Sequence, residues 1–121
     1  MPDKYQIIFV TVPDRTVASD LSDGLLKKKL AACVSTLPGL SSSYWWQGKI
    51  ETAEELLLII KTKTALTPDI IQFVRENHPY SVPETVCLNI AAGSESYLNW
   101  LGANTLFTTN ITKDKLKGKH S

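Results

Sequence analysis

The stretch from Glu76 to Thr85, ENHPYSVPET, places the imidazole of His78 six residues before the carboxylate of Glu84. Two such groups close together could bind a metal ion or act as an acid/base pair. The stretch could equally be a stiff turn between a helix and a strand. In such a turn Pro79 and Pro83 restrict the backbone, and His78 donates a hydrogen bond to a backbone carbonyl or a carboxylate. Only the surrounding chain can decide among these interpretations.

Cys33 adds a thiol to the same set of candidate groups. With His78 as base and Glu84 as orienting carboxylate, it would complete the parts of a nucleophilic catalytic site. A reactive thiol requires an accessible, electropositive environment, whereas the residues around Cys33, LAACVS, are typical of a buried strand. The glycines are scattered singly and form no phosphate-binding loop. We therefore expect that the protein is not an enzyme.

The composition is that of a globular domain with balanced charge. The chain has 121 residues, 43% of them hydrophobic and 21% charged, and a formal net charge of +1. This balance provides no electrostatic basis for binding nucleic acid or an anionic membrane. The apolar run IIFV near the start is too short to span a bilayer and lacks the flanks of a signal peptide. We expect a cytoplasmic protein with no nucleic-acid or membrane partner.

Hydrophobic spacing and end signals predict strands and helices that alternate along the chain. Apolar, β-branched runs indicate the strands, and apolar residues at helical spacing indicate the helices. The expected elements are a strand over Tyr5–Val12, a helix from Arg15 to about Leu30, a strand over Ala31–Leu37 ended by Pro38-Gly39 and followed by extended chain, a tight turn at Gln47-Gly48, a strand over Lys49–Lys63, a helix from Leu66 to His78, a strand over Glu84–Ala92 and a helix from Glu95 to about Ala103, capped by Ser94.

This order, β-α-β-β-α-β-α, is typical of an α+β ferredoxin-like fold. Its antiparallel sheet has the strand order 4-1-3-2, and the helices cover one face. Residues 1–104 are expected to form the single domain, and the lysine-rich residues 105–121 a mobile tail. Cys33 and Cys87 would then lie near opposite edges of the sheet, so we expect free thiols.

The strand predicted over Lys49–Lys63 is long for a domain of this size. Fifteen residues at roughly 3.3 Å each span about 50 Å, whereas a globule of this length is roughly 35 Å across. A continuous strand would therefore carry the hairpin tip, with Tyr44, Trp45 and Trp46, beyond the domain. We predict that this hairpin lies along a neighbouring subunit. The alternative is a bulge near Thr52–Glu55 that folds the hairpin back onto its own chain.

Several blocks of the sequence resemble, in order and spacing, the CutA family of divalent-cation tolerance proteins. They are KKLAACVSTLPGLSSSYWWQGKIE, LLLIIKT, ENHPYSVPE and SYLNWL, and the match runs from about Ile7 to Leu101. The resemblance implies a ferredoxin-like protomer related in shape to PII signalling proteins. It further implies a homotrimer held through its long hairpins, a role in tolerance of copper and other divalent metals, and no established catalytic activity.

The resemblance also bears on the metal ligands. Copper sites proposed for bacterial relatives use a cysteine and adjacent histidines, and two of those positions fall at Val10 and Asn77 in this chain. His78 is then the remaining strong ligand, and Glu84 or Cys33 could complete a site in the fold or across subunits. The expected metal ligands are therefore His78, Glu84 and Cys33, with copper or another divalent metal as the ion. The stiff-turn interpretation of His78 stays open.

Two other ligand classes also stay open. By analogy of shape with PII proteins, clefts between subunits could hold a small anionic effector. Glu51, Glu54 and Glu55 could bind a hard cation through their oxygens, although a solvated strand face is the expected role of these three residues.

Overall fold

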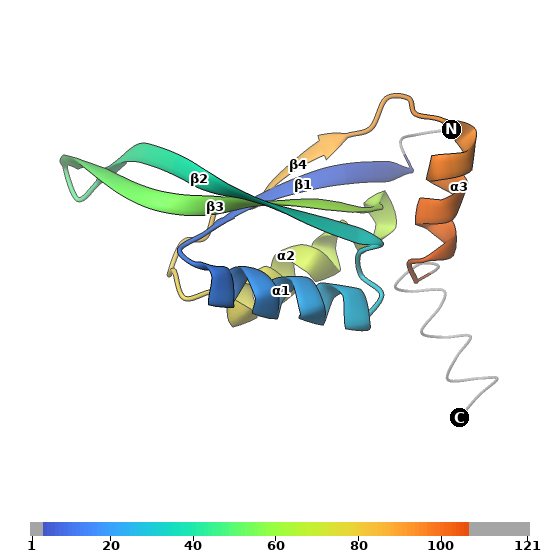
Figure 1. Ribbon diagram of the computed structural model, residues 1–121, viewed down its shortest axis with the longest axis horizontal. Coiled ribbons are helices and arrows are strands. Elements are labelled where there is room, and N and C mark those ends of the chain that lie inside the picture. Colours follow the sequence, from blue (N-terminus) through green and yellow to red (C-terminus); the bar gives the residue numbers. More distant parts are fainter. Residues whose placement is uncertain (1–3, 107–121) are drawn as a thin grey trace.

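The computed structural model describes residues 4–106, which form an α+β fold (Figure 1). Its elements are β1 (Tyr5–Val12), α1 (Arg15–Lys27), β2 (Cys33–Trp46), β3 (Lys49–Lys63), a 3-10 turn (Thr64–Leu66), α2 (Thr67–Asn77), β4 (Val86–Asn89) and α3 (Glu95–Ala103). The strands form one antiparallel sheet in the order β2-β3-β1-β4, and α1 and α2 lie on one face of it. The predicted ferredoxin-like fold and its strand order are confirmed.

The hydrophobic core fills the space between the sheet and these two helices. In β1, Ile8, Val10 and Val12 have no exposed surface, and Leu58 and Ile60 of β3 are buried in the same way. Because side chains alternate along a strand, Ile7 and Phe9 point to the opposite face. Phe9 pairs directly with Ile59 of β3 and Val86 of β4, and Ile7 pairs with Leu88 of β4. The same alternation places Leu57 of β3 on this face, two residues from Ile59. We call this second face, which α1 and α2 do not cover, the open face of the sheet.

Helix α1 ends at Lys27, earlier than the hydrophobic spacing predicts. Lys29 adopts a left-handed conformation with φ of 60°, and its amide donates to the carbonyl of Leu26 at 3.0 Å. The amide of Leu30 donates to the carbonyl of Leu25, also at 3.0 Å. These two bonds form a Schellman motif, which closes the helix and turns Leu30 back into the core. The prediction extended too far because a lysine occupies the position where glycine usually marks such an end.

The hairpin formed by β2 and β3 projects beyond the helical layer (Figure 1). β3 is continuous, so the expected overhang is confirmed and the predicted alternative of a bulge near Thr52–Glu55 is absent. Pro38-Gly39 does not end the strand as predicted. It produces a shift in register between Leu37 and Leu40, with Gly39 at φ of 82°, and pairing continues to Trp46. Gln47 and Gly48 both have positive φ, as a tight two-residue hairpin turn requires.

Helix α3 packs against one end of the sheet and begins where the sequence predicts. The side chain of Ser94 accepts a hydrogen bond from the amide of Tyr97 at 3.3 Å, which confirms the predicted cap. Leu101 is fully buried, whereas Tyr97 and Trp100 are exposed and stack on each other with ring centroids 5.6 Å apart. The helix is thus anchored by one apolar side chain and leaves two aromatic rings at the surface.

The ordered chain continues past α3 to the end of the described residues. Thr105 is buried, and its hydroxyl donates to the carbonyl of Leu101 at 3.2 Å. The amide of Leu106 donates to the carbonyl of Lys29 at 3.0 Å, and the ammonium of Lys63 donates to the carbonyl of Leu106 at 2.7 Å. The first two residues of the predicted tail therefore pack on the domain. The remainder, 107–121, lies outside the described residues.

Within 4–106, no helix has the length and apolar character needed to cross a membrane.

Candidate functional site

His78 lies at the C-terminal end of α2, where the chain leaves the helical layer. Its side chain is only 8% exposed, and Nε2 lies 2.8 Å from the carbonyl oxygen of Thr11 at the end of β1. Because a carbonyl oxygen can only accept, Nε2 carries the proton. Nδ1 then accepts a hydrogen bond from the amide of Tyr80 at 3.1 Å. Both ring nitrogens are thus engaged with backbone groups, and the imidazole joins the loop after α2 to β1.

Tyr80 extends the same cluster to the base of the hairpin. Its ring is tilted against that of His78, with centroids 4.7 Å apart, and its hydroxyl donates to a carboxylate oxygen of Glu55 at 2.8 Å. Glu55 is 7% exposed, so this carboxylate is not on a solvated strand face as the sequence suggested. Burial, reinforced by the hydrogen bond and negative charge of Glu55, raises the pKa of Tyr80 to about 12.

The raised pKa of Tyr80 predicts a loss of stability at alkaline pH. The neutral phenol stabilises the folded state fully below its ordinary pKa of 10.0, and this contribution is lost as the pH rises through about 12. Tyr80→Phe should be less stable than wild type near neutral pH, because Glu55 loses its donor. This difference should shrink as the pH rises from about 10 to 12, as measured by urea unfolding.

The matched control is Phe9→Leu, which changes an aromatic side chain of β1 that carries no titratable group. Its difference in unfolding free energy from wild type should stay constant over the same pH range. A difference for Tyr80→Phe that also stayed constant would contradict the assigned role of the Glu55–Tyr80 pair.

Cys33 lies at the start of β2, far from this cluster. Its partly buried sulfur is 3.9 Å from the ammonium of Lys61 and 4.0 Å from the hydroxyl of Ser35. Cys33 pairs with Lys61, which in turn pairs with Ile7, whereas the carbonyl that binds His78 belongs to Thr11. Four residues of strand, about 13 Å, separate these two levels of the sheet. One chain therefore does not bring Cys33 to His78.

The other candidate positions are also apart from one another. Glu84 is exposed in the loop that leads to β4. Val10 is fully buried in the core, and Asn77 uses its side-chain amide to donate to the carbonyl of Phe73 at 2.8 Å. Among residues 4–106, no group of three or more His, Cys, Asp or Glu side chains is arranged to hold a metal ion. The three predicted ligands, and equally the three parts of a catalytic site, are not assembled within one chain.

The link between Glu55 and Tyr80 was missed from the sequence. Glu55 stands in the polar half of the predicted strand beside Glu51 and Glu54, both of which are exposed. Nothing in that local pattern distinguishes the buried glutamate from its neighbours. The path of the loop from His78 to Tyr80 brings a phenol within hydrogen-bond distance of this buried glutamate.

Known proteins match this chain in both sequence and fold. The family model described as "CutA1 divalent ion tolerance protein" matches residues 6–104. The divalent-cation tolerance protein CutA of Thermus thermophilus is 45% identical over 100 residues, which cover 83% of this chain and 97% of that protein. The chloroplastic protein CutA 1 of Oryza sativa is 43% identical over 99 residues, which cover 82% of this chain.

Solved structures agree with these sequence relationships. The crystal structure of CutA1 from Oryza sativa superposes with a TM-score of 0.85 at 40% identity, covering 88% of this chain and 97% of that one. The Thermus thermophilus structure gives a TM-score of 0.82 at 44% identity, covering 84% of this chain and 98% of that one.

The relatives differ in length and in compartment. The chain spans 56% of the length of the rice relative and 54% of that of the Arabidopsis thaliana relative, both of which are named chloroplastic. A structure from Archaeoglobus fulgidus, 34% identical, is of a CutA described as periplasmic. Across these differences the matched region is the ferredoxin-like domain described above. The chain belongs to the CutA1 family of divalent ion tolerance proteins.

Proposed function

We propose that this chain acts in divalent-cation tolerance as a homotrimer that binds metal ions and catalyses no reaction. The family relationship supports the link to divalent cations. The observation that carries the proposed assembly is the large apolar surface that a single chain leaves uncovered. Since the candidate ligands are apart in one chain, assembly is also the means of bringing them together.

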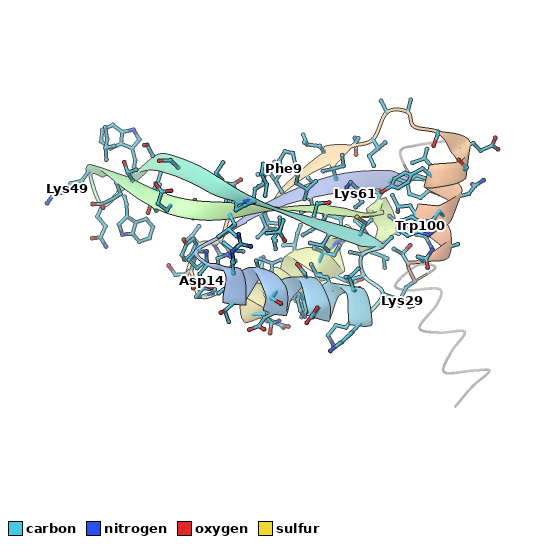
Figure 2. The ribbon with its side chains drawn as sticks, in the orientation of Figure 1. Phe9, Asp14, Lys29, Lys49, Lys61 and Trp100 are labelled. Atoms are coloured by element: carbon cyan, nitrogen blue, oxygen red, sulfur yellow. The ribbon has the colours of Figure 1, made fainter. Side chains whose placement is uncertain are left out.

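That surface consists of two parts on the same sheet. On the open face, Leu37, Val86 and Leu88 are 51%, 46% and 46% exposed. On the projecting hairpin, four large side chains are exposed: Tyr44 by 43%, Trp45 by 72%, Trp46 by 46% and Ile50 by 65%. Figure 2 shows the hairpin side chains standing clear of the rest of the domain near Lys49. Exposed apolar surface of this extent is typical of an interface between subunits.

A second copy of the chain is the partner that suits both parts. The hairpin is too long for its own domain but can lie along the sheet of a neighbour, where its aromatic side chains would be covered. Such a contact is heterologous, because the hairpin of one subunit meets a different surface of the next, and it can close into a ring. The resemblance to PII-like trimers implies that this ring contains three subunits.

In this trimer we propose that His78, Glu84 and Cys33 from neighbouring subunits contribute to binding copper or another divalent metal. Imidazole and thiolate are suited to copper or zinc, and a carboxylate adds negative charge. To bind a metal, the ring of His78 must break one of its two hydrogen bonds. At Nδ1 this is the bond from the amide of Tyr80, and at Nε2 it is the bond to the carbonyl of Thr11. This exchange would weaken binding and couple it to the loop after α2.

Calorimetric titration of Cu²⁺ and Zn²⁺ under anaerobic conditions tests the metal site. Cys33→Ser and Glu84→Gln should each weaken binding by about tenfold or more, because each removes a ligand atom or a charge. The matched control is Glu76→Gln, which changes an exposed carboxylate of α2 that accepts a hydrogen bond from Gln72. Isotherms unchanged by both ligand variants would contradict the site and leave the trimer as a separate question.

We also propose the cytosol as the compartment of this protein. Cys33 and Cys87 are both free thiols on strands at opposite edges of the sheet, as predicted. Free thiols are suited to a reducing environment. Cell fractionation with a tagged full-length chain tests this proposal, and recovery from an organelle or the periplasm would overturn it.

A further inference from the structure

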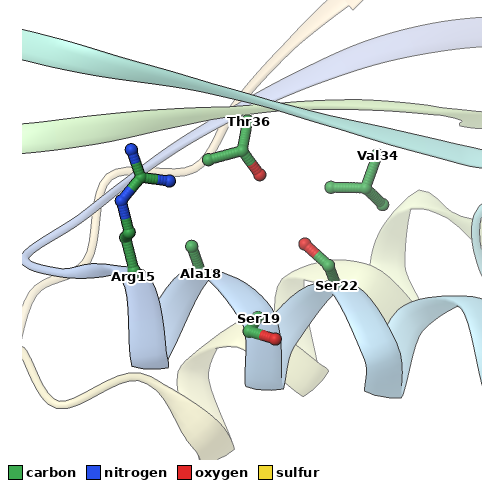
Figure 3. A pocket seen from close by; sticks show the side chains of 6 residues that line it. All are labelled: Arg15, Ala18, Ser19, Ser22, Val34 and Thr36. Carbon is green, nitrogen blue, oxygen red and sulfur yellow. The ribbon is translucent and has the colours of Figure 1, made fainter.

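A shallow cavity of about 400 Å³, widely open to solvent, lies between α1 and β2 (Figure 3). It exists because α1 presents small side chains to the strand at this point. The residues that line it are Arg15, Ala18, Ser19 and Ser22 of α1, with Val34 and Thr36 of β2. All six belong to one chain, so the cavity is formed without a contribution from a second subunit.

The polar groups around this cavity are an arginine and hydroxyls. The guanidinium of Arg15 stands at one end, and no residue of the described range 4–106 forms an ion pair or hydrogen bond with it. The adjacent carboxylate of Asp14 is occupied, since it accepts a hydrogen bond from the amide of Val17 at 2.9 Å as the cap of α1. The positive charge of Arg15 is therefore available to a ligand.

Ser22 provides a second, independent indication of a ligand. Its hydroxyl oxygen is buried and has no hydrogen-bond partner within the described residues. A buried hydroxyl without a partner destabilises the folded state, so a natural chain usually provides one. Figure 3 shows the hydroxyls of Ser22 and Thr36 directed into the space between the helix and the strand. A ligand with acceptor oxygens in that space would supply the missing partner.

We propose that this cavity binds a small oxyanion, the phosphate or carboxylate group of a small molecule. A guanidinium forms paired hydrogen bonds with such groups, and the hydroxyls of Ser22 and Thr36 can donate to the remaining oxygens. The lining contains no carboxylate that would repel an anion. The arginine disfavours a divalent cation here, so this site is independent of the proposed metal ligands. With one charge and an open side, binding is weak and sensitive to salt.

Titration with inorganic phosphate and, separately, with malonate tests this site in the full-length protein. Ionic strength is held constant with sodium chloride, and binding is followed by ¹H–¹⁵N NMR. The expected shifts concentrate at the amides from Arg15 to Ser22 and from Val34 to Thr36. Shifts with phosphate alone identify a phosphate-bearing ligand, and shifts with malonate alone identify a carboxylate.

Two variants and one control complete the test. Arg15→Gln should weaken anion binding by about tenfold or more, because it removes the charged paired donor. Ser22→Ala should weaken it less and should raise the melting temperature of the anion-free protein, since it removes the partnerless hydroxyl. Arg75→Gln, which changes the exposed arginine of α2, should bind like wild type. Equal affinity in Arg15→Gln and wild type, or shifts spread evenly over the surface, would overturn the proposal.

Discussion

Leu88→Glu should separate the trimer into monomers. Leu88 is 46% exposed in the single chain, so a glutamate there costs the protomer little. In the proposed trimer the same side chain lies in an apolar interface, where a carboxylate without a partner is strongly unfavourable. A cost of about 4 kcal/mol per contact would weaken association roughly a thousandfold. Light scattering should find three times 13.4 kDa for wild type and 13.4 kDa for the variant.

Leu26→Glu is the matched control for this substitution. Leu26 is 40% exposed and lies on α1, in the layer that covers the other face of the sheet. The same change in charge should therefore leave the mass at that of the trimer. A monomeric wild type, or a Leu88→Glu protein that keeps the mass of wild type, would contradict the assembly. Circular dichroism should show that the variant retains its fold.

His78→Ala should be the most destabilising single change in the loop after α2. The substitution removes a buried ring and leaves the carbonyl of Thr11 and the amide of Tyr80 without their partners. Each lost partner costs about 1–3 kcal/mol, and the cavity adds to this, so a total of roughly 3–4 kcal/mol is expected. Urea unfolding measures it directly, with metal removed by a chelator.

Two further variants separate the roles of this histidine. His78→Gln keeps a donor that can reach the carbonyl of Thr11 and should recover part of the lost stability. Asn77→Ala changes the exposed neighbour and should cost little, about 0.5–1 kcal/mol, for its single bond to Phe73. If His78 acted only as a metal ligand, His78→Ala would be as stable as wild type in the chelator. That result would contradict the structural role of its two hydrogen bonds.

Features that depend on neighbours in the chain were predictable from the sequence alone. The cap at Ser94, the turn at Gln47-Gly48 and the alternation of β1 each follow from the preferences of a few adjacent residues. The length of the predicted strand over Lys49–Lys63 indicated that a continuous strand would carry the hairpin past the domain, and its pairing with β2 shows that the strand is continuous. These local signals, taken in order, were sufficient for the ferredoxin-like fold and its strand order.

Features that depend on residues far apart in the chain were decided only by the tertiary structure. Pro38-Gly39 resembles the end of a strand, yet pairing with β3 on both sides carries β2 through it as a bulge. β4, predicted over Glu84–Ala92, is limited to Val86–Asn89, the residues in register with β1, and one further bond joins the amide of Ile90 to the carbonyl of Tyr5. In both cases pairing with another strand, rather than the local preference of the residues, set the extent of the strand.

The candidate site shows the same division. Residue types alone selected His78, Glu84 and Cys33 as groups able to bind a metal, because imidazole, carboxylate and thiolate have that chemistry in any fold. Their distances depend on the register of β1, β2 and β3 and on the path of the loop after α2. That geometry engages both nitrogens of His78 with the backbone and buries Glu55 against Tyr80. The ability of each side chain to bind a metal depends on its residue type, whereas the distances between these side chains depend on the fold.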